Sequence, residues 1–142
     1  MNPKRYFGLA LVLIAVVAAL GLDYAGRDHY PRRYTVDFAS GTSLSETGER
    51  QVDQIAAIMA RQPAYDAVVI GHTGTRGDPE ANQALGLDRA EAVAQTLRDA
   101  GIATDRLETH SMGGAEPLEQ RGGEGERGYQ RRLSRAEVRL NP

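Results

Sequence analysis

The stretch from residue 66 to residue 101 constrains the fold most strongly. Its first part, DAVVIGH (66–72), is a short continuous apolar run with β-branched residues, which predicts a buried central strand. The Gly-rich segment that follows predicts a loop, and Pro79 suits the first turn of the next helix. The apolar stripe of that helix is Ala90, Val93, Ala94 and Leu97, and Gly101 supplies its C-terminal stop. A strand that passes into a helix through such a loop is suited to holding a small charged ligand.

The segment before this strand predicts one more strand and one more helix. TVDFAS (35–40) alternates polar and apolar residues, the pattern of a half-buried strand. Ser45 is a suitable N-cap for an amphipathic helix at about 46–61, which Pro63 then stops. The chain therefore begins its folded part with a strand followed by a helix.

The C-terminal part predicts two further strands, at 106–112 and 136–140. Residues 113–130 between them are Gly-rich and charged, which predicts a mobile loop. The order in the domain at 35–140 is then β-α-β-α-β-β. This order gives the α+β class, with two helices packed on one face of a mixed sheet.

The N-terminal residues 1–22 predict an export segment. Lys4 and Arg5 precede an unbroken weakly polar to apolar run at 6–22, and a short polar linker at 23–34 follows. The run is slightly short for a membrane-spanning helix and longer than the apolar part of a usual signal peptide. An uncleaved anchor is favoured over a cleaved signal peptide, because no Ala-x-Ala site follows the run closely. In either case the positive residues stay in the cytoplasm and the domain is exported.

Composition and motifs exclude several classes of function. The formal net charge is −2, so nothing favours nucleic acid as a partner. The chain has no cysteine, hence no disulfide, thiolate metal site or Cys nucleophile. We find no paired acids, no Gly-x-Ser-x-Gly setting and no His/Asp/Glu spacing of a metal site. The sequence therefore predicts a protein that is not an enzyme and needs no cofactor, with His72 a satisfied structural histidine at a strand end.

Four segments carry a resemblance to a known family: VDFASGTSLSETG, IGHTGTRGDPEANQALGLDRAEAV, LRDAGIATDRL and SMGGAEP. They make the region 35–140 similar to the OmpA-like peptidoglycan-binding domain of outer-membrane porin tails, the peptidoglycan-associated lipoprotein and flagellar motor stators. The family pattern in the second segment is Gly-His-Thr-Asp, a Gly three further on, then Asn-x-x-Leu-Ser-x-x-Arg-Ala. The corresponding positions here are Gly71, His72, Thr73, Gly74, Gly77, Asn82, Leu85, Gly86, Arg89 and Ala90.

The resemblance implies a ligand, the diaminopimelate group of the peptidoglycan stem peptide. This group carries an ammonium and a carboxylate on one carbon, so its recognition needs one acid and one fixed cation. By the resemblance, Arg89 would bind the carboxylate, since its planar guanidinium fits a carboxylate well. Thr73, Asn82 and Leu85 would line the pocket.

Three positions depart from the family pattern. Gly74 stands where the family has its acid, and Gly114 stands where a Glu usually follows the third strand. On the last strand Arg135 matches, but Leu133 and Ser134 replace the family's Asn and Arg; a shifted register would instead use Arg131 and Arg132. A charge-assisted hydrogen bond contributes about 1.5–3 kcal/mol, so loss of the acid should weaken binding roughly ten- to a hundredfold.

Two residues have alternative interpretations. Asp78, in the same loop as Gly74, is a candidate substitute for the missing acid. Arg89 would, without the motif, be read as a solvated helix residue paired with Asp88 or Asp78.

The expected function is therefore a non-catalytic, membrane-anchored module that binds peptidoglycan in the periplasm of a Gram-negative bacterium. The alternative is an OmpA-like domain that has lost this ligand and serves as a protein-interaction or dimerisation module. Gly74, Gly114 and the altered C-terminal motif favour the alternative, while the intact Asn82-to-Arg89 spacing favours peptidoglycan binding.

Overall fold

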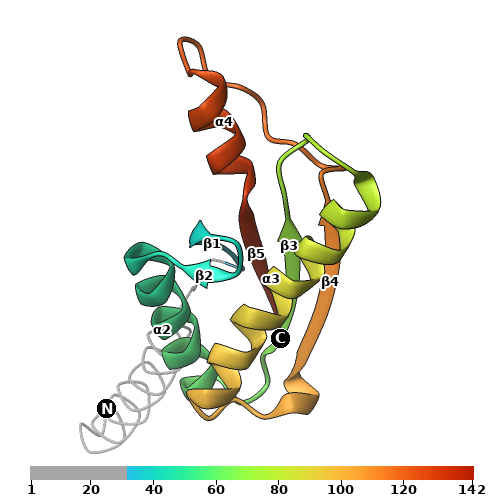
Figure 1. Cartoon of the computed structure of the whole chain (residues 1–142). Helices are drawn as coiled ribbons and strands as arrows, with labels where there is room; N and C mark the ends of the chain where they lie inside the picture. The colour runs from blue at the N-terminus through green and yellow to red at the C-terminus, as the bar shows by residue number, and fades with distance from the viewer. Residues whose placement is uncertain (1–31) are drawn as a thin grey trace, which may run out of the picture. The chain divides into compact units, whose positions relative to one another are not determined.

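The computed structural model describes residues 32–142, which form a mixed five-stranded sheet and three α-helices (Figure 1). The strands are β1 (Arg33–Ser40), β2 (Ser43–Leu44), β3 (Asp66–His72), β4 (Leu107–Gly113) and β5 (Arg135–Asn141). The helices are α2 (Glu46–Arg61), α3 (Pro79–Asp99) and α4 (Glu126–Leu133), with a short 3-10 turn, η1 (Thr104–Arg106). The expected export segment at 6–22 lies outside the described residues. In the part that is described, no helix has the length and apolar character needed to cross a membrane.

The strands lie in the order β2-β1-β5-β3-β4. β3 and β4 are parallel neighbours joined by α3, as the right-handed crossover rule leads one to expect. β5 pairs antiparallel with both β1 and β3, so the last strand of the chain lies in the middle of the sheet. The α+β class and the strands predicted at 35–40, 66–72, 106–112 and 136–140 are confirmed to within about two residues at either end.

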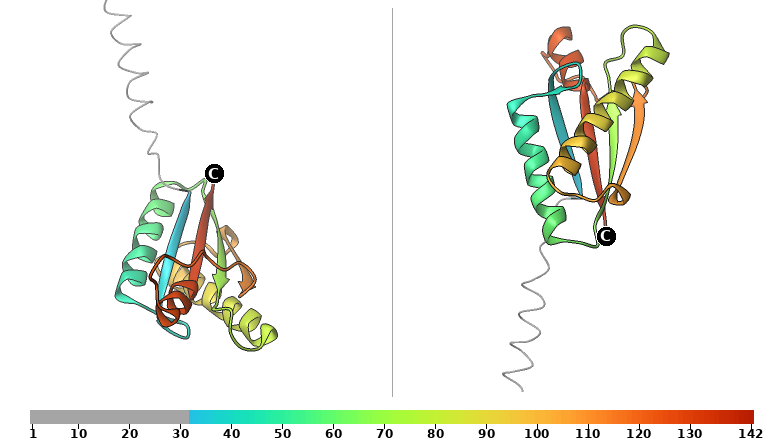
Figure 2. Two further views of the ribbon diagram at one scale, coloured as in Figure 1. Left: turned by 90° about the horizontal axis from the view of Figure 1, so that it is seen from above. Right: turned by 60° about the horizontal axis from the view of Figure 1, so that its bottom comes forward.

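Helices α2 and α3 cover one face of the sheet and contact each other (Figure 2). Ser45 caps α2, because its Oγ accepts the N–H of Gly48 at 3.0 Å. Pro79 is the first residue of α3, and Gly101 follows the end of that helix with a positive φ of 94°. These predicted start and stop signals are therefore confirmed.

The core lies between the two helices and the sheet. Its largest fully buried apolar side chains are Val36, Val52, Ile55, Ile58, Met59, Val69, Val93, Leu97, Leu133, Val138 and Leu140. Helix α3 approaches β3 so closely that a Cβ added to Gly71 would lie 1.7 Å from the backbone oxygen of Gly86. The glycines at these two positions therefore allow a contact that fixes the position of α3, and with it the site residues it carries.

The predicted number of helices is wrong, because Glu126–Leu133 forms a third helix, α4. The loop predicted at 113–130 is confirmed between β4 and residue 125, and its mobility stays a prediction. Helix α4 stands at the end of the sheet, directly before β5, and not on the face covered by α2 and α3 (Figure 1). Its ordering contacts are tertiary: Leu133 is fully buried, and the hydroxyl of Tyr129 donates to the carbonyl of Leu118 at 2.8 Å. Local propensity misses the helix because glycine and charged residues dominate the segment.

Candidate ligand site

The candidate site lies at the end of the sheet where β3 and β4 finish and α3 begins (Figure 1). Thr73 follows β3 directly and is only 3% exposed. Its N–H donates to the carbonyl of Gly113 at 2.8 Å, and its hydroxyl donates to the carbonyl of Gly74 at 3.0 Å. Thr73 therefore ties the loop after β3 to the end of β4, and its expected contact with a ligand stays a prediction.

Arg89 extends from α3 into a buried position, with 5% of its surface exposed. Its Nε donates to the carbonyl of Gly41 at 2.8 Å, and its Nη1 donates to the carbonyl of His72 at 2.9 Å. The guanidinium also lies over the ring of Phe38, 5.4 Å from the ring centroid. Arg89 thus joins three segments: α3, the β1–β2 turn and the end of β3.

The interpretation of Arg89 as a solvated partner of Asp88 or Asp78 is wrong, because the guanidinium is buried. Within residues 32–142 it has no carboxylate partner, and its Nη2 makes no hydrogen bond. Burial lowers the pKa of Arg89 from its ordinary value, since desolvation disfavours the charged form. A buried cation without a counter-ion has a strong physical preference for an anionic ligand.

Gly74 lies against α4, a contact that the sequence does not reveal. A Cβ built on Gly74 would be 2.2 Å from Oε1 of Gln130, so the end of that side chain fills the space of a residue-74 side chain. Oε1 of Gln130 accepts the N–H of Thr75 at 3.0 Å, and Nε2 donates to the Thr75 hydroxyl at 3.0 Å. Gly114 shows a similar close approach, because its Cβ would lie 2.6 Å from the carbonyl oxygen of Gly74.

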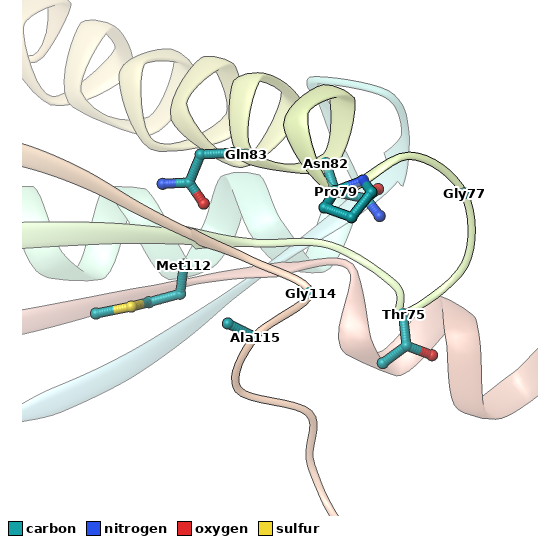
Figure 3. Close-up of a pocket in the computed structure, with 8 residues that line it drawn as sticks. All are labelled: Thr75, Gly77, Pro79, Asn82, Gln83, Met112, Gly114 and Ala115. Carbon is teal, nitrogen blue, oxygen red and sulfur yellow. The ribbon is translucent and has the colours of Figure 1, made fainter.

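Asn82 and Leu85 occupy the same face of α3 as Arg89, three and four residues apart. The amide of Asn82 donates to the carbonyl of Arg76 at 2.9 Å and so closes the loop over the start of the helix. Asn82 also lines a pocket of about 290 Å³ between this loop, α3 and the end of β4 (Figure 3). The pocket is lined by Thr75, Gly77, Pro79, Asn82, Gln83, Met112, Gly114 and Ala115.

The structure gives Asp78 the role of N-cap of α3. Its carboxylate accepts the N–H of Ala81 at 3.1 Å, an arrangement that satisfies one of the free amides of the first turn. A ligand role for Asp78 stays a prediction, and it would compete with this cap.

Arg135, the first residue of β5, is buried and is not among the residues that line the pocket near Asn82. Its Nη2 donates to Oε1 of Glu137 at 2.8 Å, and its Nη1 donates to the carbonyl of Leu133 at 3.3 Å. It lines a second pocket of about 370 Å³ with Thr35, Asp37, Leu118, Arg121, Arg132 and Glu137. In the sheet Arg135 neighbours the end of β3, because the adjacent Ala136 pairs with Gly71, and a ligand role for Arg135 stays a prediction.

His72 ends β3 and is fully buried, which confirms its structural position. The expectation that its ring is satisfied is wrong, because neither ring nitrogen has a hydrogen-bond partner within the described chain. Nε2 lies 3.7 Å from a carboxylate oxygen of Glu137. Burial, followed by the charge of Arg135, lowers the pKa of His72, and Glu137 opposes this effect.

Residues 32–142 contain no group of three His, Cys, Asp or Glu side chains placed to hold a metal ion. Sequence reasoning missed Thr75 and Gln130, which lie 55 positions apart in the chain, because no local pattern signals such a contact.

Comparison with known proteins agrees with this geometry. Residues 38–131 match the family model described as the OmpA family, so this chain belongs to the OmpA family. Together with the strand-end loop and the buried Arg89, the match confirms the family resemblance of the sequence.

This chain matches only part of the length of its individual relatives. The chain is 37% identical over 95 residues to the peptidoglycan-associated lipoprotein of Pasteurella multocida, covering 66% of this chain and 63% of that one. It is 31% identical over 88 residues to the probable lipoprotein YiaD of Escherichia coli, covering 62% of this chain and 40% of that one. The crystal structure of the peptidoglycan-associated lipoprotein from Burkholderia pseudomallei superposes with a TM-score of 0.65 at 29% identity, over 78% of this chain and 91% of the other.

Proposed function

We propose that this protein is a non-catalytic module that binds peptidoglycan in the envelope of a Gram-negative bacterium. Family membership and the relatives named peptidoglycan-associated lipoprotein support this assignment. The ligand we propose is the diaminopimelate group of the stem peptide, whose carboxylate Arg89 binds. Asn82, Leu85 and the backbone around Thr73 and Gly74 complete the site.

The observation that carries the proposal is the state of Arg89. The guanidinium is buried, its Nε and Nη1 are used by carbonyl groups, and its Nη2 is unused within the described residues. A guanidinium held in this way is pre-oriented, so little side-chain entropy is lost when a carboxylate binds. The same carbonyl contacts fix the β1–β2 turn and the end of β3 around the ligand.

The test is isothermal titration calorimetry of the detergent-solubilised full chain with a diaminopimelate-containing stem peptide. We expect saturable binding, and we expect Arg89→Ala to weaken it roughly ten- to a hundredfold, the value of one charge-assisted hydrogen bond. Because Arg89→Ala also removes two structural hydrogen bonds, Arg89→Lys is measured as well; it keeps the charge but loses the planar fork.

Arg98 supplies the matched control, because it lies on the same helix and pairs with Glu91 away from the site. Arg98→Ala should leave the affinity for the peptide unchanged. Absence of binding by the parent chain, with folding verified by circular dichroism, would refute the proposed ligand.

A second candidate function is protein interaction or dimerisation without a peptidoglycan ligand. One observation favours it: β4 is an edge strand, its Met112 is 36% exposed, and Leu87 of the neighbouring α3 is 47% exposed. Sedimentation velocity separates the two candidates, since Leu87→Glu would disrupt a dimer built on this edge and would not affect peptide binding.

We further propose that residues 6–22 anchor the protein in a membrane and that the folded domain lies in the periplasm. The positive charges before the apolar run support this topology. Accessibility of the domain to added protease in spheroplasts, but not in intact cells, would support it. Release of the protein from membranes by high salt alone would contradict it.

A further inference from the structure

The diaminopimelate group of the proposed function carries an ammonium as well as a carboxylate, so its site needs an anionic group in addition to Arg89. Position 74 cannot provide one, because Gly74 has no side chain and Gln130 occupies the space beside it. Gly74 does not have a positive φ, unlike five other glycines of the described chain. The position therefore needs glycine for its small size and not for its backbone freedom. Helix α4 therefore takes the place of a residue-74 side chain.

The Gln130 amide is neutral and already hydrogen-bonded, so it does not supply the anion. Its oxygen accepts the N–H of Thr75, and its Nε2 donates to the Thr75 hydroxyl and to Oε1 of Glu126 at 2.9 Å. Both N–H groups of the amide are thus used. Gln130 holds the carboxylate of Glu126 beside the loop after β3.

Arg76 of this loop contacts the same carboxylate oxygen, since its Nη2 lies 3.2 Å from Oε1 of Glu126. The side chain of Glu126 is 46% exposed and that of Arg76 is 73% exposed. The ion pair is therefore weak, and a competing cation can replace Arg76. Oε2 of Glu126 has no hydrogen-bond partner within residues 32–142. Asp78, the acid of the loop after β3, is engaged in capping α3.

We propose that Glu126 of α4 supplies the anion that binds the ammonium group of the ligand, with Gln130 as its positioning residue. This inference rests on the proposed function and assigns the part of the site that Gly74 leaves without a side chain. Arg89 and Glu126 then bracket the loop after β3, the first through the carbonyl of His72 and the second through Arg76. The ligand's ammonium replaces Arg76 on Glu126 when it binds.

The proposal predicts opposite effects for the two members of the ion pair. Glu126→Gln should weaken binding of the stem peptide about tenfold, since it removes a charge-assisted contact and keeps the shape of the side chain. Arg76→Ala should instead tighten binding by about threefold, because it removes the cation that competes for Glu126. Gln130→Ala should weaken binding less than Glu126→Gln, because the carboxylate remains but is no longer held.

The experiment is titration of the full chain with two peptides: the stem peptide and the same peptide with the side-chain ammonium of diaminopimelate acetylated. The parent should prefer the free ammonium, and Glu126→Gln should lose this preference without a loss of affinity for the acetylated peptide. Glu119→Gln is the matched control, because Glu119 is an exposed acid of the preceding loop whose carboxylate makes no contact with the 74–76 segment.

The outcomes separate this inference from the proposed function. If the parent binds and Glu126→Gln binds the free-ammonium peptide equally well, Glu126 has no ammonium role, while the wall-binding function stands. If Arg76→Ala and Glu126→Gln weaken binding by the same factor, the ion pair is structural and the inference fails. If the parent binds neither peptide, both the inference and the proposed function are overturned.

Discussion

Replacing Gly74 by alanine tests the contact between α4 and the loop after β3. The added Cβ would lie 2.2 Å from Oε1 of Gln130, and its next contacts are at 3.4 and 4.0 Å on the same residue. Gln130 must therefore swing away and lose its bonds to Thr75 and Glu126. These bonds are partly exposed, so their joint loss should cost about 1–2 kcal/mol.

The unfolded chain makes an opposing contribution to the free energy of unfolding. Alanine reduces the freedom of the unfolded state and stabilises the fold by about 0.4–1 kcal/mol where the native φ suits it. Gly74 does not have a positive φ, so alanine suits its backbone. The net expected cost of Gly74→Ala is then about 1 kcal/mol. In a Gln130→Ala background nothing obstructs the Cβ, and the same substitution should be neutral or slightly stabilising.

The assay is urea denaturation of the parent, the two single variants and the double variant, compared at equal m-values. We expect a coupling free energy of about 1–2 kcal/mol between positions 74 and 130. Gly114→Ala is the matched control: its Cβ would meet the backbone oxygen of Gly74 at 2.6 Å, a clash that removing Gln130 does not relieve. An equal cost of Gly74→Ala with and without Gln130 would refute the argument.

Three further predictions concern the fold around the site. Gly71→Ala should destabilise the protein by about 3 kcal/mol in urea denaturation, because the added Cβ would lie 1.7 Å from the backbone oxygen of Gly86, which cannot swing away; a cost below 1 kcal/mol would contradict the close approach. Burial depresses the pKa of His72, so near pH 6.5 the imidazole takes up a proton in the unfolded chain but not in the folded one. The free energy of unfolding should therefore fall as the pH drops through that range, by at most about 1.4 kcal/mol per pH unit. His72→Phe should remove that part of the pH dependence, and an unchanged profile would argue against a buried neutral histidine. Ser45→Ala should cost about 1 kcal/mol in thermal or urea unfolding, because it removes the cap on the N–H of Gly48, and a neutral result would show that water replaces the cap.

The sequence by itself determined the elements whose signals are local. Strand β3 is a continuous β-branched run, α3 begins at a proline and ends before a glycine, and α2 begins at its serine cap. Each of these depends on residues within a few positions of one another, so apolar periodicity and capping chemistry suffice to find them. The loop between β3 and α3 was expected to hold a ligand because a strand passes into a helix there. Asn82, Leu85 and Arg89 were assigned as site residues through the resemblance to the family motif, not through a local structural signal.

Only the tertiary structure decided how these elements meet. β5 lies between β1 and β3 because its backbone groups find partners on both sides there, and no feature of its seven residues specifies that neighbourhood. Helix α4 depends on Leu133 being buried, and a Gly-rich segment carries no sign of that burial. The space beside Gly74 is filled by a side chain from a different part of the chain, with the Thr75–Gln130 bonds spanning 55 positions. Contacts of this kind are fixed by packing of the whole domain, which is why a glycine that looks like a lost acid in the sequence is a docking point for a helix in the structure.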